Sequence, residues 1–220
     1  MRGLKRPMTG CGALLGAIVS LSGALAGSPA EPRLAAITPV FAQLVMFSLP
    51  PEFKSQKPTY EKSSGSFYIR QQVPEGETLG KWSRMLTLSG TRGLVGNPNA
   101  TPQALLARMS ADFQRHCPDT FSTEAPGTQK VDGYDAYEVI VSCGRVQSGK
   151  ESYSESAVML TVKGSSDYYT LQLTERGRDA AQAHQIDVDY WTKQLARLNP
   201  IRLCAIVPGE SAPYPSCARR

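Results

Sequence analysis

The chain has 220 residues, 41% of them hydrophobic, and a formal net charge of +5 at pH 7. This apolar content excludes wholesale disorder, and the length suits one domain with short extensions. Residues 1–26 hold three of the 24 basic residues and none of the 19 acidic ones, so the rest of the chain carries 21 basic and 19 acidic residues, a net charge of +2. Residues 27–220 contain no dense basic cluster, and nucleic acid is therefore not an expected partner.

Residues 1–26 have the pattern of a secretory signal peptide. A basic segment precedes an uncharged run of apolar and small residues from Gly12 to Ala26. Ala24-Leu25-Ala26 is a small-x-small cleavage site, and Ser28-Pro29-Ala30 is a second one. We predict a periplasmic or secreted protein without a membrane span after cleavage. The alternative is a protein held at the inner membrane by an uncleaved leader, because the apolar run approaches the length of a spanning helix.

The next segments predict strands. Residues 27–40 are expected to be a loose N-terminal arm, and residues 41–200 one α+β domain. Period-2 patterns and turn residues predict four strands in its first half, namely Leu44 to Pro50, Thr59 to Lys62, Phe67 to Val73 and Met85 to Leu88. In the third strand, Phe67 and Ile69 lie on one side and Tyr68 and Arg70 on the other, an alternation typical of a sheet with one buried face.

A helix is predicted from Thr101 to Cys117. Thr101 can cap its N-terminus, Pro102 suits the first helical position, and Pro118 ends it. An apolar stripe recurs every four residues at Leu105, Met109, Phe113 and Cys117.

The second half predicts four strands and a closing helix. Asp132-Gly133 is a two-residue hairpin signal between the first two of these strands. The closing helix is expected over Ala181 to Leu198 and is ended by Asn199-Pro200. Residues 201–220 are expected to be a tail with little regular structure.

This order predicts an α+β fold in which an antiparallel sheet of six to seven strands carries two main helices. The element order from Phe41 to Leu198, with the early FSLPPEFK stretch at Phe47 to Lys54, resembles the PsbP-type fold. That fold is an antiparallel sheet with helices on its faces, and it is shared with bacterial envelope proteins. GETLGKWSRMLTL, residues 76–88, is similar to a segment of small secreted proteobacterial proteins without assigned activity. Neither resemblance carries catalytic residues.

Four cysteines remain after the leader, which contains Cys11. An even number in an exported protein predicts two disulfides. We expect Cys117–Cys143, because both side chains point toward the core, and Cys204–Cys217, which would close a loop in the tail. No Cys-x-x-Cys pair is present, and no metal site or cofactor is expected.

The catalytic residue types are sparse. His116 and His184 are the two histidines, and His184 precedes Asp187 and Asp189 within one predicted helical turn. A hydrolase that uses His184, or the Glu75 and Glu77 pair, is the alternative hypothesis. The sequence contains no Gly-x-Ser-x-Gly, Walker or His-Glu-x-x-His motif.

The favoured hypothesis is a non-catalytic binding or accessory module of the bacterial envelope. Its partner would be an envelope protein or another surface component. Aromatic residues beside loops often build recognition surfaces. We therefore predict binding residues near the turn that follows Val73, namely Glu77, Lys81 and Trp82, together with Tyr68.

Overall fold

The structure, a computed structural model, describes residues 34–53, 57–149 and 151–219. The predicted leader and its cleavage sites lie outside these residues. The described chain has α+β content, with ten strands and three α-helices. Within it, no helix is both long enough and apolar enough to cross a lipid bilayer.

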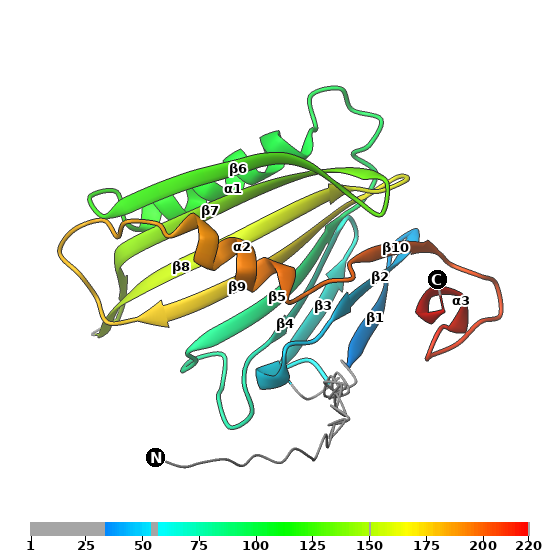
Figure 1. The fold of residues 1–220 in the computed structure, drawn as a ribbon, viewed down its shortest axis with the longest axis horizontal. Coiled ribbons are helices and arrows are strands. Elements are labelled where there is room, and N and C mark those ends of the chain that lie inside the picture. Colours follow the sequence, from blue (N-terminus) through cyan, green and yellow to red (C-terminus); the bar gives the residue numbers. More distant parts are fainter. Residues whose placement is uncertain (1–33, 54–56, 150, 220) are drawn as a thin grey trace, which may run out of the picture. The chain divides into compact units, whose positions relative to one another are not determined.

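The larger sheet has seven antiparallel strands in the order β3-β4-β5-β9-β8-β7-β6 (Figure 1). These strands are β3 (Tyr60–Ser64), β4 (Phe67–Gln72), β5 (Arg84–Thr91), β6 (Phe121–Val131), β7 (Tyr134–Ser148), β8 (Glu151–Lys163) and β9 (Tyr168–Gly177). The predicted Asp132-Gly133 hairpin joins β6 to β7, and both turn residues have positive φ. The prediction of an antiparallel sheet of six to seven strands is confirmed.

Two helices pack on opposite faces of this sheet (Figure 1). Helix α1 (Pro102–His116) packs on β7, β8 and β6, and Oγ1 of Thr101 caps it by accepting a bond from Ala104 N at 3.0 Å. Helix α2 (Val188–Ala196) packs against β8. Asp187 caps α2 by accepting a bond from Tyr190 N at 2.9 Å.

A second sheet of three antiparallel strands has the order β1-β2-β10. Its strands are β1 (Ala35–Val40), β2 (Gln43–Ser48) and β10 (Arg202–Ala205). A short 3-10 helix, η1 (Pro51–Phe53), follows β2. This sheet packs closely on β5, because a Cβ atom built on Gly90 would lie 2.5 Å from Cγ1 of Val40.

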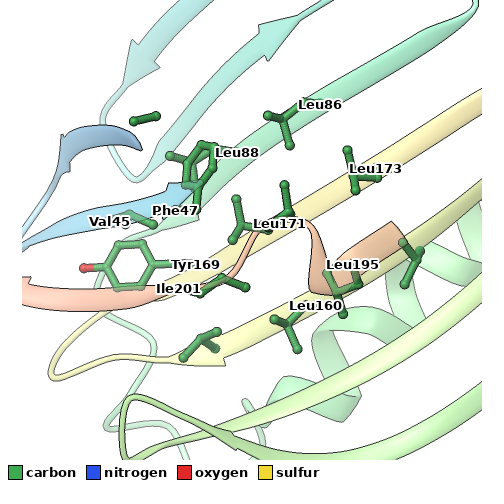
Figure 2. Close-up of a cluster of buried hydrophobic side chains, with 14 of the residues drawn as sticks. Val45, Phe47, Leu86, Leu88, Leu160, Tyr169, Leu171, Leu173, Leu195 and Ile201 are labelled. Atoms are coloured by element: carbon green, nitrogen blue, oxygen red, sulfur yellow. The ribbon is translucent and has the colours of Figure 1, made fainter. Parts of the chain in front are cut away.

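The main core lies between the larger sheet, α2 and the three-stranded sheet. Figure 2 shows side chains from β2, β5, β8, β9 and α2 converging there. Leu160 and Leu171 are among its fully buried members, and Leu195 reaches them from α2. A smaller cluster on the opposite face joins Leu106 of α1 to Val141 and Met159.

The structure differs from two expectations about the termini. The arm predicted to be loose over residues 27–40 contains β1, and the tail over residues 201–220 contains β10 and a four-residue helix, α3 (Pro215–Ala218). Both strands pair with β2, and Leu203 lies opposite Val45. The pairing of β10 with β2 joins residues distant in the chain and has no local sequence signal, whereas β1 and β2 form a local hairpin through the turn at Phe41 and Ala42.

The closing helix begins at Val188 and not at Ala181. The residues before it run alongside β7, because Ala180 N donates to Gly144 O at 2.8 Å. A Cβ atom at Gly144 would lie 2.2 Å from the carbonyl oxygen of Gln182. Tertiary backbone contacts replace the helical hydrogen bonds in this segment.

Both predicted disulfides are present. Cys117 follows α1 and bonds to Cys143 of β7, with a Cα–Cα distance of 5.7 Å. Cys204 of β10 bonds to Cys217 of α3, with a Cα–Cα distance of 5.6 Å. The first bridge attaches α1 to the larger sheet, and the second attaches the end of the chain to the smaller one.

Candidate functional site

A groove of about 630 Å³ lies between α1 and the part of the larger sheet that α1 does not cover. Helix α1 packs on β6, β7 and β8, so the same face of β4, β5 and β9 lies open beside it. The floor is polar because every second residue of two neighbouring strands carries a hydroxyl or amide group. These floor residues are Thr87 and Ser89 of β5 and Thr170, Gln172 and Thr174 of β9.

The walls of the groove are more apolar than its floor. Leu105 and Met109 line it from α1, and Ile69 lines it from β4. At its edge, Phe67 is 44% exposed and Leu79 is 38% exposed. The groove therefore presents hydroxyl and amide groups below and apolar side chains around them, a combination typical of sites that bind a ligand with both characters.

One end of the groove is formed by a stacked guanidinium group. The guanidinium carbon of Arg176 lies 3.7 Å from the ring centroid of Trp82 and 4.0 Å from that of Tyr153. The same side chain donates to Glu155 at 3.1 Å and to the Tyr153 hydroxyl at 2.9 Å. These contacts hold Arg176 rigidly, since cation–π stacking and charged hydrogen bonds both restrict it.

Glu155 is largely buried beside this stack. Burial raises the pKa of its carboxyl group, while the charge of Arg176 and its hydrogen bond act in the opposite direction. Glu155 and Arg176 therefore bind each other and do not offer a free charge to a ligand.

Arg108 of α1 is the cation in the groove that has no ion-pair partner among the described residues. Asp112, which also lines the groove, is paired with Arg115 on the same helix. Arg176 is paired with Glu155. An anionic group entering the groove would therefore meet one available guanidinium group, at Arg108.

A second hollow, of about 580 Å³, shares Trp82 and Arg176 with the groove. Glu77 and Lys81 line it from the turn between β4 and β5. The Glu77 carboxylate accepts bonds from the backbone and hydroxyl of Ser83, at 2.7 and 2.6 Å. Glu77 thus closes the turn, whereas Lys81 is exposed.

The structure brings together three of the four predicted binding residues. Glu77, Lys81 and Trp82 line one hollow, but Trp82 is only 8% exposed and packs on Val73. Tyr68 is 6% exposed, belongs to the main core and donates its hydroxyl to Glu61. It therefore lies on the face of β4 opposite Phe67.

Three residues of the alternative catalytic hypothesis, His184, Asp187 and Glu77, each make a structural hydrogen bond. The Ser122 hydroxyl donates to the backbone carbonyl of His184 at 2.7 Å and not to its ring. Asp187 caps α2, and Glu77 bonds to Ser83. Among the described residues, no group of three or more His, Cys, Asp or Glu side chains is arranged to hold a metal ion.

The sequence contains a signal for the groove that we did not interpret. Thr87 and Ser89 alternate with buried leucines in β5, and Thr170, Gln172 and Thr174 do the same in β9. Polar alternation in two strands predicts one open sheet face, but their pairing had to be known first. Arg176 could not be found in this way, because its partners come from β8 and from the turn before β5.

No protein-family model matches this chain, and no curated protein matches it either. The interpretation of the groove therefore depends on its geometry and chemistry.

Proposed function

We propose that this protein is an exported, disulfide-stabilised binding module of the bacterial envelope, and that the groove beside α1 holds a segment of its partner. The observation that carries the proposal is the groove itself, in which a polar floor, apolar edges and one available guanidinium group face the same space. The two disulfides support an extracytoplasmic location. A PsbP-type fold is part of the proposal, supported by an antiparallel sheet with a helix on each face.

The chemistry of the groove indicates the kind of segment that fits. Ser89 and Gln172, the less buried residues of the floor, can bond to the backbone of an extended peptide, and Phe67 and Leu79 can contact apolar side chains. Arg108 would pair with a carboxylate. We therefore propose an apolar segment with an acidic residue, contributed by an envelope protein.

Affinity capture from an envelope extract tests this proposal. Arg108→Gln should weaken capture of the partner about tenfold through the loss of one charged contact. Thr87→Trp should abolish capture by filling the groove. The matched control is Arg145→Gln, because neither Arg145 nor its partner Asp179 lines the groove.

Equal capture by the wild type and both groove variants would refute the proposed site. Circular dichroism and thermal unfolding of each variant must first show a native fold.

The proposal of export has a separate test. Intact-mass measurement of the protein from its native host, without reductant, should give a chain that begins after Ala26 or Ala30 and lacks four thiol hydrogens. A full-length mass would instead support the anchored accessory protein.

A further inference from the structure

The register of the sheet orders the residues along the groove beside α1. At one end, Phe67 of β4 lies opposite Thr91 of β5. Toward the other end, Met85 of β5 lies opposite Thr174 of β9. The distance from Thr91 to Met85 along β5 is about 20 Å at the rise of a strand, which is also the length of an extended peptide of about seven residues.

Two exposed apolar side chains lie at the ends of the groove, on the side away from α1. Phe67 is the first residue of β4. Leu79 belongs to the turn that joins the end of β4 to the start of β5. Because this turn lies at the opposite end of β4 from Phe67, the length of the groove separates the two side chains.

Helix α1 follows the groove from the same end to the other. At its start, the hydroxyl of Tyr168 donates to the carbonyl of Ala100, and Tyr168 lies opposite Thr91. After its last residue, Cys117 is bonded to the residue of β7 that lies opposite Glu155. The helix therefore forms one wall along the whole groove.

Arg108 lies near the middle of this wall. It is the seventh of the 15 residues of α1, and a helix of this length spans about 22 Å, close to the length of the groove. Its side chain is exposed and has no ion-pair partner among the described residues. Asp112, one turn further along α1, is paired with Arg115. The free positive charge of the groove is therefore at its centre, opposite the side that carries the apolar ends.

An extended segment lying between the two walls matches these three side chains. Successive side chains of an extended chain point to opposite sides, so its first and seventh residues face one wall and its fourth residue faces the other. Apolar first and seventh residues would contact Phe67 and Leu79, and an acidic fourth residue would bind Arg108. The backbone groups then point to the floor, where Ser89 and Gln172 can bond to them.

We propose that the groove recognises an extended seven-residue segment with an aspartate or glutamate as its fourth residue and apolar residues as its first and seventh. This inference rests on the proposed function and adds the spacing of the recognised side chains. The pattern is the same from both ends, so it holds for either direction of the bound chain. An acidic third or fifth residue would point away from Arg108.

Three synthetic peptides of one composition, with acetylated and amidated ends, test this spacing. Their sequences are Leu-Ser-Ser-Glu-Ser-Ser-Leu, Leu-Ser-Ser-Ser-Glu-Ser-Leu and Leu-Ser-Ser-Glu-Leu-Ser-Ser. The measurement is a titration of the protein with each peptide, followed by two-dimensional amide NMR spectra. The first peptide should bind most tightly and shift the signals of Ser89 and Gln172. The second should bind about tenfold more weakly, because its carboxylate faces the wrong wall. The third should bind about fivefold more weakly, because its leucines cannot reach both ends.

Two variants identify the group that distinguishes the first two peptides. Arg108→Gln should bind both with equal affinity, because it lacks the guanidinium group that selects between them. Lys62→Gln is the matched control, since Lys62 is an exposed cation that lies opposite Ile69 on β3 but does not line the groove. This control should keep the full tenfold difference.

The inference is overturned if the wild type binds the first two peptides equally well, if it binds neither, or if their difference persists in Arg108→Gln. The proposed function is tested separately by capture from the envelope extract. Capture that depends on Arg108, combined with equal binding of the peptides, would keep the groove as the partner site and refute only the spacing. Capture that depends on neither Arg108 nor Thr87 would refute both.

Discussion

The two faces of the seven-stranded sheet are built from the same strands but are covered to different extents. One face packs against α2 and the three-stranded sheet and contains most of the buried apolar side chains. The other packs against α1 over β6, β7 and β8 and leaves β4, β5 and β9 open as the groove. The covered face supplies stability, and the open face is the surface to which we propose that a partner binds.

In strand β4, the elements that pack over each face of the sheet, and not the polarity of the side chain, decide which residues are buried. Phe67 faces the open side and is 44% exposed, whereas Tyr68 and Gln72 face the covered side and are buried. Gln72 is accommodated there because its Nε2 donates to the carbonyl of Phe53 at 3.3 Å. A polar side chain can be buried when it finds such a partner.

The largest expected difference between the faces is at two neighbouring residues of β9. Leu171→Ala on the covered face should lower the free energy of unfolding by about 4 kcal/mol, since it removes a buried side chain and leaves a cavity. Gln172→Ala on the open face should cost less than about 1 kcal/mol. Urea unfolding measures both, and similar losses would show that the groove is packed like a core.

The disulfide that holds α1 on the open face gives the second prediction. Replacing Cys117 and Cys143 by alanine should cost about 3.5 kcal/mol in the chain-entropy model, because the bridge closes 26 residues. The control is the double replacement of Cys204 and Cys217 by alanine. The bridge between them closes 13 residues. Its cost should be smaller by about 0.6 kcal/mol. A reversed order would mean that α1 is held mainly by packing and not by its bridge.

The smallest effect is expected at an ion-pair network at the edge of the covered face. Glu52 contacts Arg84 at 3.3 Å and Arg197 at 2.5 Å. Burial raises the pKa of Glu52, but the hydrogen bond and charge of Arg197 and the charge of Arg84 outweigh it, so the net pKa is below the ordinary value of 4.5. Its stabilisation is therefore present above pH 4.5 and is lost as the pH falls through the lowered value.

Glu52→Gln should cost about 1 kcal/mol at pH 7 and nothing at a pH below the lowered value. The measurement is the free energy of unfolding of wild type and variant from pH 7 to pH 2. A difference that stays constant over this range would exclude the charge of Glu52 as its cause. Asp135→Asn is a control at an exposed pair with Lys130, where a smaller change is expected.

Local patterns predicted much of the fold correctly. The Thr101 cap, the Asp132-Gly133 turn and the stripe at Met109 and Phe113 are signals between residues close in the chain, and all are observed. Compositional reasoning about the cysteines also succeeded, because burial of Cys117 and Cys143 follows from their positions on a helix and a strand.

The candidate site was predicted only in part. Trp82 was identified because a tryptophan beside a polar turn is conspicuous, and it does form one end of the groove. Arg176 and Arg108 were missed, since one depends on stacking against Trp82 and Tyr153 and the other on the position of α1 over the sheet.

The amino-acid sequence by itself determined the strands and helices of the main domain, the caps of α1 and the pairing of the cysteines, because each depends on local periodicity or on burial that periodicity predicts. Only the tertiary structure decided that β10 joins β2, where α2 begins, and which half of the second sheet face stays open. The physical reason is that strand pairing and sheet cover are contacts between distant segments. Their free energy depends on surfaces that exist only after the chain has folded.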